Sequence, residues 1–104
     1  MAFDTVPMTL KIQRSEEDRL VVFILSGRIQ LEHLPELNHL FEFEAADQSI
    51  VLDLAEVRLV DRETVRFLTT CEADGVMLHR CPAYIREWIE KERKNEAERK
   101  WLRE

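Results

Sequence analysis

The sequence contains little glycine, proline or cysteine. Two glycines and three prolines among 104 residues leave no flexible linker or low-complexity segment, so we expect a single domain over residues 1–104. Two cysteines could not build a disulfide scaffold. The longest apolar run, Leu20–Leu25, is far shorter than the ~20 residues of a membrane-spanning helix. These scarcities exclude disulfide-rich and membrane-spanning classes and favour a small soluble globular domain.

The charge is mostly acidic. Lys and Arg total 15 and Asp and Glu total 21, which gives a formal net charge of −6 and argues against nonspecific binding to nucleic acids or anionic membranes. The N-terminus shows no basic stretch followed by an apolar core, so no export signal is visible. Together with the unpaired cysteines, this predicts a cytoplasmic protein.

Apolar patterning predicts four strands. Residues Met8–Arg14 alternate between apolar and polar, which is typical of a half-buried strand, and a polar turn over residues 15–18 joins them to the next segment. The run Leu20–Leu25 is apolar throughout and predicts a strand buried on both faces. We expect a third strand over Ile50–Leu54, ending near Asp53, and a short fourth strand over Val76–Leu78.

Helical spacing predicts three helices between and after these strands. The first runs from Leu34 to about Glu44; the second begins after Asp61, a good N-cap, and ends at Asp74-Gly75; the third opens at Cys81-Pro82. The order β-β-α-β-α-β-α predicts an α/β fold with a four-stranded mixed sheet and helices packed on it.

No enzyme signature is present in the sequence. There is no glycine-rich phosphate loop, no Cys-x-x-Cys pair and no His-x-x-x-His pair, so we expect no catalytic residue, no metal and no cofactor. The residues after the third strand offer two interpretations. They form either a recognition surface at a helix N-terminus or an ordinary cap, with Asp61 as the cap and Glu63 favourable to the helix dipole.

Several segments together resemble the STAS domain, the family that includes bacterial anti-sigma factor antagonists. These are Leu25-Ser-Gly-Arg-Ile29, Leu34-Pro-Glu-Leu37, Ile50-Val-Leu-Asp-Leu54 and the Leu-Val-Asp61 that opens a helix. The likeness covers about residues 8–90. It implies a STAS-like fold and a non-enzymatic partner-switching module in transcription regulation, whose partner is an anti-sigma factor with serine-kinase activity.

The sequence departs from the family at its regulatory site. The family keeps a phosphorylated serine within Asp-Ser-Ser-Gly, whereas this chain has Asp61-Arg62-Glu63-Thr64, with Glu63 at the usual phosphoacceptor. A carboxylate carries about one negative charge where phosphoserine carries about −1.5 to −2. Either Glu63 fixes a phosphorylated-like state, which the positive charge of Arg62 weakens, or the site is lost and the module binds constitutively. Thr64, one residue later, is an alternative phosphoacceptor.

The resemblance also implies where a partner would bind. We expect an anti-sigma factor or kinase-type ATPase domain to dock around the start of the second helix, with Ser26 and Arg28 bordering the same surface. The residues expected to contribute are Asp61, Arg62, Glu63, Thr64 and Arg66, together with those two.

A second interpretation depends on Cys81. A thiol at a helix N-cap gains from the helix dipole, which can lower its pKa and make it nucleophilic. The dipeptide Cys81-Pro82 resembles small sulfur-carrier proteins, although those have it early in the chain with a second proline. A small thiol carrier or redox protein is therefore the alternative function, whereas Cys71 lies on an apolar helix stripe and is expected in the core.

The charged residues 91–104 predict a helical extension. Pairs such as Glu96–Lys100 stabilise a helix, so the third helix should continue through this segment. Trp101 and Leu102 lie about three turns beyond the apolar residues expected to pack on the sheet. They predict either a homodimer or partner contact or, in the alternative, a solvated tail.

Overall fold

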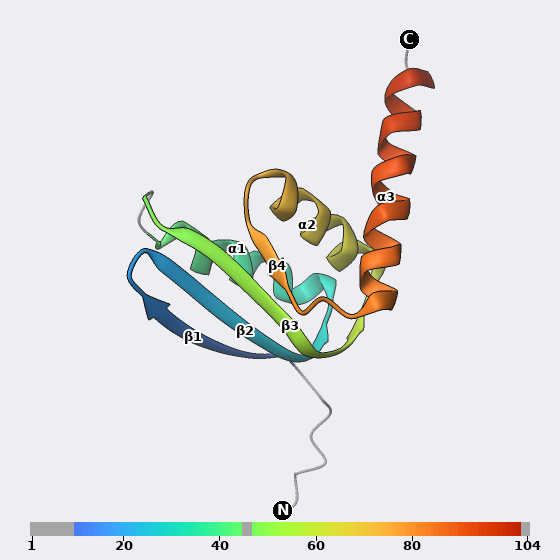
Figure 1. Ribbon diagram of the computed structural model, residues 1–104. Coiled ribbons are helices and arrows are strands. Elements are labelled where there is room, and N and C mark those ends of the chain that lie inside the picture. Colours follow the sequence, from blue (N-terminus) through green and yellow to red (C-terminus); the bar gives the residue numbers. More distant parts are fainter. Residues whose placement is uncertain (1–9, 45–46, 103–104) are drawn as a thin grey trace, which may run out of the picture.

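The structure, a computed structural model, describes residues 10–44 and 47–102, with side chains described as far as residue 97. The elements, in chain order, are β1 (Lys11–Glu17), β2 (Leu20–Ile29), the short 3-10 helix η2 (Leu31–His33), α1 (Leu34–Glu42), β3 (Ser49–Val60), α2 (Arg62–Ala73), β4 (Met77–His79) and α3 (Ala83–Leu102). Figure 1 shows one sheet with α1 and α2 against it and α3 extending away from it.

The sheet has four strands in the order β1-β2-β3-β4. β1 pairs antiparallel with β2, whereas β2–β3 and β3–β4 are parallel. A turn with Asp18 at φ +54° closes the initial hairpin. The predicted α/β class, the mixed sheet and the element order are therefore confirmed. The first strand was predicted from Met8, which lies outside the described residues, and it ends at Glu17 instead of Arg14.

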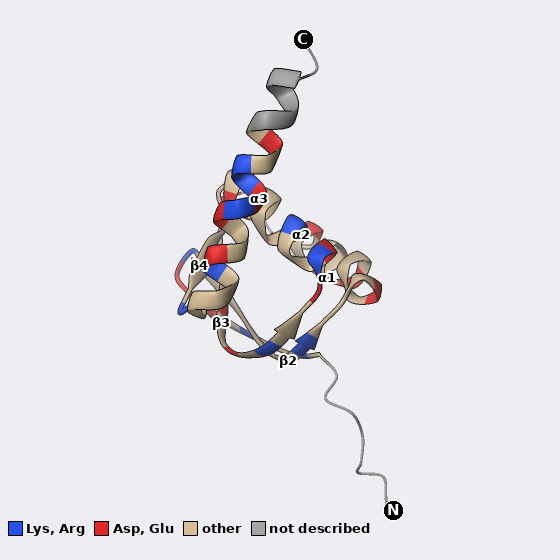
Figure 2. Ribbon diagram, turned by 90° about the vertical axis from the view of Figure 1, so that its right-hand side faces the viewer, with Lys and Arg blue, Asp and Glu red and all other residues tan. Residues whose placement is uncertain are grey.

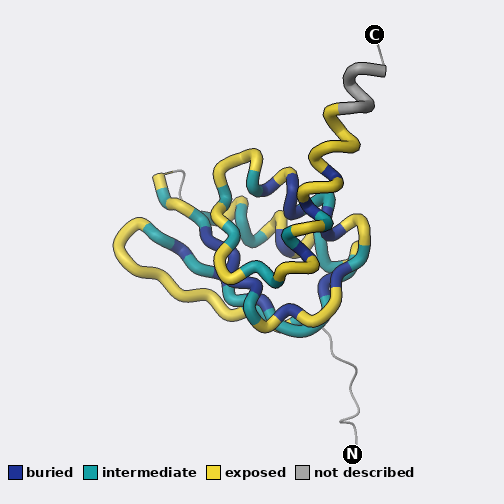
Figure 3. The backbone as a smooth tube through the Cα atoms, turned by 45° about the vertical axis from the view of Figure 1, so that its right-hand side comes forward, coloured by how far each residue is buried: buried dark blue, intermediate teal, exposed yellow. Residues whose placement is uncertain are grey.

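The core lies between the sheet and the helices. Val21, Phe23 and Leu25 of β2 share one buried cluster with Leu68 of α2 and Ile89 of α3. The intervening residues of β2 are only half-buried, as the alternating colours of this strand in Figure 3 show. The prediction that this strand is buried on both faces is therefore wrong, because α1, α2 and α3 all contribute to a core on one face.

β3 is much longer than the sequence suggested. It continues past Asp53 to Val60, and its second half pairs with the end of β2, Ile29 opposite Val60. Val57 and Val60 point into the core, whereas Glu56 and Arg58 are exposed. The residues that follow the predicted third strand are therefore part of β3. This extension carries the chain directly to the start of α2.

The third helix packs only through its first half. Ile85 and Ile89 are fully buried and Glu92 is 3% exposed, but residues 93–97 are all exposed (Figure 3). The predicted continuation of the helix is confirmed as far as Leu102, and this part projects beyond the sheet (Figure 1). The contacts predicted for Trp101 and Leu102 lie outside the described side chains. None of the described helices is long and apolar enough to cross a membrane.

Candidate functional site

The start of α2 is anchored by Asp61, which caps the helix as predicted. One carboxylate oxygen, Oδ1, accepts a hydrogen bond from the Thr64 amide at 2.9 Å, and the other, Oδ2, accepts one from the Leu31 amide at 2.8 Å. Asp61 therefore satisfies a free amide of the first turn and also ties α2 to the segment that follows β2. Two chain segments 30 residues apart are held together by one side chain.

Several groups set the protonation of Asp61. Partial burial alone would raise the pKa of this carboxyl, but the hydrogen bonds from the Thr64 hydroxyl and from the Leu31 and Thr64 amides outweigh burial, so the pKa lies below its usual range. Asp61 is consequently ionised near neutral pH. Its negative charge lies at the positive end of the α2 dipole, where it is favourable.

Thr64 lies inside the protein. The residue is 0% exposed, and its hydroxyl oxygen is 2.6 Å from Asp61 Oδ1 and 3.0 Å from the carbonyl oxygen of Ile29. Its single proton is shared between these two acceptors. The interpretation of Thr64 as a phosphoacceptor or as a direct partner contact therefore fails in the folded protein, because a kinase or a partner cannot reach a hydroxyl with no accessible surface.

Glu63, by contrast, is exposed in the first turn of α2. Its side chain is 47% exposed, and Oε2 lies 3.6 Å from Nη1 of Arg66, one turn further on. The cation beside Glu63 is thus Arg66. The sequence had suggested Arg62, because it is the adjacent residue. The carboxylate is accessible where the resemblance expects a phosphorylated serine.

Arg62 and Arg66 both extend towards α3. Nε of Arg62 lies 3.4 Å from Oε2 of Glu92, and Nε of Arg66 lies 3.5 Å from Oε1 of the same residue. Glu92 is the buried member, with only 4% of its side chain exposed. Both arginines therefore fix α3 on α2, and sequence reasoning missed Glu92 because its partners lie 30 and 26 residues away.

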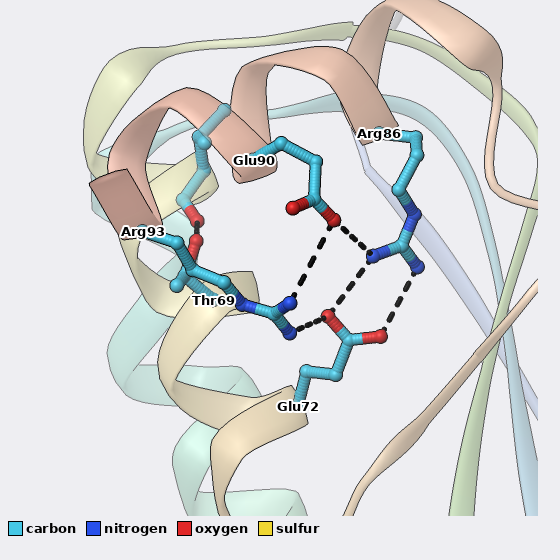
Figure 4. A network of polar contacts seen from close by, with 6 residues as sticks. Thr69, Glu72, Arg86, Glu90 and Arg93 are labelled. Atoms are coloured by element: carbon cyan, nitrogen blue, oxygen red, sulfur yellow. Dashed lines mark hydrogen bonds and ion pairs between the residues drawn. The ribbon is translucent and has the colours of Figure 1, made fainter. Parts of the chain in front are cut away.

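A second ionic cluster joins the same two helices further along α2. Glu72 accepts two hydrogen bonds from Arg86, at 3.0 and 3.1 Å, and a third from Arg93 at 2.6 Å (Figure 4). Glu90 lies 3.7 Å from both arginines. Figure 2 shows this concentration of both charge signs on the packed part of α3. The pairs orient α3 in addition to the contacts of its two buried isoleucines.

Two exposed apolar side chains flank the start of α2, and sequence reasoning did not single them out. Leu31 is 57% exposed and its amide is bonded to Asp61, while Leu59, 48% exposed, precedes Asp61 by two residues. Single exposed apolar side chains are ordinary on protein surfaces, so it is the position of these two beside the start of α2 that makes them candidates for a contact. The signal in the sequence was one apolar residue near the end of each of the two segments that meet at the start of α2, Leu31 after β2 and Leu59 in β3.

The other two predicted surface residues lie in the sheet. Arg28 pairs with Leu59 across β2 and β3, next to the start of α2, and its Nε is buried without a hydrogen-bond partner among the described atoms. Ser26 pairs with Lys11 on one side and Glu56 on the other. Arg28 therefore borders the predicted surface, whereas Ser26 lies two residues earlier along the strand.

Cys81 lacks the features of a reactive thiol. It precedes Pro82, whose carbonyl accepts the first hydrogen bonds of α3, so Cys81 is not the N-cap residue. Burial, reinforced by the charge of Glu72, raises the pKa of this thiol despite the opposing effect of Arg86. The other cysteine, Cys71, is buried as predicted, and burial raises its pKa to about 12. Neither environment favours a thiolate.

Asp53, which was predicted near the end of the third strand, lies within β3 and makes an ionic contact there. It is 8% exposed in the middle of β3, and Arg80 donates two hydrogen bonds to its carboxylate at 3.2 and 2.5 Å. Together with a hydrogen bond from the Ala55 amide, Arg80 lowers the pKa of Asp53 below its usual range, against the effect of burial. Asp53 therefore links β3 to the residue after β4 and does not border the α2 surface.

Comparisons with known proteins find few similarities. No protein-family model matches the chain, and no curated protein matches it. A crystal structure of Mglu is 25% identical and superposes with a TM-score of 0.46, over 64% of this chain but only 18% of the Mglu chain. An uncharacterised protein of the DUF3478 family with a SpoIIAA-like fold, from Shewanella loihica PV-4, is 17% identical, with a TM-score of 0.44 over 75% of this chain and 71% of its own.

Both TM-scores are below 0.5, so the STAS-like fold that the sequence resemblance predicts is compared with the topology of this chain itself. The initial antiparallel hairpin, the two parallel pairings and the helix that starts directly after β3 supply that topology.

Proposed function

We propose that this chain is a regulatory protein-binding module similar to an anti-sigma factor antagonist, with a surface that does not switch by phosphorylation. The observation that carries the proposal is the exposed carboxylate of Glu63 in the first turn of α2. In the family that the sequence resembles, this position holds the regulated serine. A carboxylate cannot accept a stable phosphate, and Thr64 next to it is buried.

The contact surface would combine one charge with two apolar anchors. Leu31 and Leu59 supply exposed apolar area on either side of the helix start, and Glu63 supplies the negative charge. Arg62 and Arg66 have their guanidinium groups near Glu92, so they contribute less to a partner than the sequence suggested. The partner class is an anti-sigma factor or a kinase-type ATPase domain, as the resemblance implies.

A capture experiment from a native lysate tests this proposal. Wild type, Glu63→Ser and Glu63→Ala would be compared as baits, with the captured proteins identified by mass spectrometry. Equal capture of a kinase-type ATPase by all three baits supports constitutive binding. Capture by both variants but not by wild type indicates that Glu63 mimics a phosphate. Leu31→Asp should abolish capture, whereas Met77→Asp, at another exposed apolar residue, on β4, should not. Absence of any such partner from all the baits would contradict the proposal.

A cysteine-based carrier remains the second candidate from the sequence, but no observation in the structure favours it. The raised pKa of Cys81 opposes a nucleophilic role at neutral pH.

A further inference from the structure

An open groove runs between α1 and α2 on the helical side of the molecule. Its volume is about 510 Å³. The floor is apolar and is contributed by both helices, by the first half of β3 and by the segment before β4: Leu34, Phe41, Ile50, Phe67 and Val76. A groove of this size with an apolar floor can take several side chains of another molecule.

The floor is held rigidly by aromatic packing. The Phe41 and Phe67 rings stack with centroids 6.1 Å apart and planes inclined by 18°. Phe41 also packs against the buried Phe23 of β2, with centroids 5.4 Å apart. The two rings that line the groove are therefore fixed by the core below them, and a ligand would not have to order them.

The rim of the groove is acidic. Three exposed carboxylates line it, Glu42 at the end of α1, Glu63 at the start of α2 and Asp74 at the end of α2. Among the described residues, Arg66 is the one Lys or Arg that lines it, and its guanidinium lies 3.6 Å from Glu63 and 3.5 Å from the buried Glu92. Three carboxylates against one guanidinium leave the groove with a net negative rim around an apolar floor.

We propose that this groove binds a cationic amphipathic helix of a partner protein. Glu63 and Asp74 are separated by the length of α2, about 16 Å at 1.5 Å per residue, which corresponds to about three turns of a docked helix. Such a helix would place apolar side chains at positions i, i+3 or i+4, and i+7 on the floor and its Lys or Arg side chains against the rim. An acidic segment would meet like charges at both ends of the groove.

The inference deepens the proposed function and rests on it, because Glu63 belongs both to the groove and to the surface at the start of α2. It adds the chemistry of the segment that the partner presents. One edge of the docked helix would contact the same carboxylate that occupies the usual phosphoacceptor position.

Titration of the isotope-labelled full chain with two synthetic peptides tests the proposal. The first is a 14-residue Leu/Lys helix with Leu at i, i+3, i+4 and i+7, and the second has Glu in place of every Lys. Shifts of amide resonances should concentrate at Asn38, Phe67 and Thr70, which line the groove. The Glu peptide should bind at least about tenfold more weakly, since several rim charges contribute to discrimination.

Charge-matched variants separate the groove from the general acidity of the chain. The rim variant carries Glu42→Gln, Glu63→Gln and Asp74→Asn, and the control carries Glu17→Gln, Glu56→Gln and Glu87→Gln; all six residues are exposed, so both proteins should fold. The rim variant should bind the Lys peptide about tenfold more weakly than the control. Equal weakening in the two variants, shifts centred away from the groove, or absence of binding would each overturn the proposal.

The two proposals can fail separately. If the lysate experiment captures a kinase-type ATPase but the Lys peptide does not bind the groove, this inference is wrong and the proposed function stands. If the peptide binds in the groove while no such partner is captured, the groove is supported and the proposed function fails.

Discussion

Replacing Asp61 by Ala should destabilise the protein by about 2 kcal/mol. Loss of an N-cap side chain costs about 1 kcal/mol, and here the Thr64 amide that loses its partner belongs to a fully buried residue. Loss of the Leu31 contact adds about 1 kcal/mol, less than the ~1.5–3 kcal/mol of a hydrogen bond to a charged group, because Leu31 is exposed and its amide can regain water.

Urea unfolding at pH 7 measures this change. Asp61→Asn keeps one oxygen acceptor and should therefore lose about half as much as Asp61→Ala, since Asn is also a good N-cap but can no longer accept from both amides. Asp74→Ala, at the other end of α2, is the control and should change stability by less than about 0.5 kcal/mol. A loss below about 0.5 kcal/mol for Asp61→Ala would refute the claim that this carboxylate holds the two segments together.

The same residue makes a testable contribution to the pH dependence of stability. Because the pKa of Asp61 is lowered in the folded state, its charge stabilises the fold above the unfolded-state pKa of about 3.9. This contribution disappears as the pH falls through the lower folded-state pKa. The stability difference between wild type and Asp61→Asn should therefore be constant near neutral pH and shrink below about pH 4; a difference that grows towards acid would contradict the assignment.

Three further changes test the packing around the site. In urea unfolding, Glu92→Gln should lower the free energy of unfolding by less than about 1 kcal/mol. Replacing both Arg62 and Arg66 by Gln should lower it by about 3 kcal/mol, because only the carboxylate is buried and it would keep its charge without these two partners. The opposite order would contradict this assignment. Cys81 in the native protein at pH 7 should react with iodoacetamide more slowly than in the unfolded chain, because burial raises the pKa of the thiol, and rapid native reaction would favour the carrier interpretation. Gly75→Ala should cost about 1 kcal/mol by backbone strain alone, since φ is +102° and a new Cβ meets no atom within 4 Å; an unchanged urea midpoint would refute this.

Local patterns predicted the elements but not the contacts between them. The N-cap role of Asp61 and the start of α2 follow from short-range chemistry, because a cap bonds to an amide three residues later. The full length of β3 could not be predicted in this way. Glu56 and Arg58 interrupt the apolar run, and only pairing with the end of β2 shows that the strand continues through them.

The two buried carboxylates show the same limit. Asp53 looked like the end of a strand because an unpaired acid in the middle of a buried strand is costly, and Arg80, 27 residues later, removes that cost. Glu92 looked like one charge among many on a solvated helix. Its burial depends on two arginines of α2, and neither spacing nor composition reveals that pairing.

The start of α2 is fixed from two directions, and this arrangement bears on how it could bind. Asp61 ties it to the segment after β2, while Arg62 and Arg66 tie it to the buried Glu92 of α3. A surface that is already ordered loses little conformational entropy when a partner docks. A site regulated by phosphate needs a charge that comes and goes, whereas here the charge of Glu63 is permanent and its surroundings are rigid. For the function proposed above, this rigid arrangement implies constant recognition, so that any regulation would act on the partner or on the docking of α3.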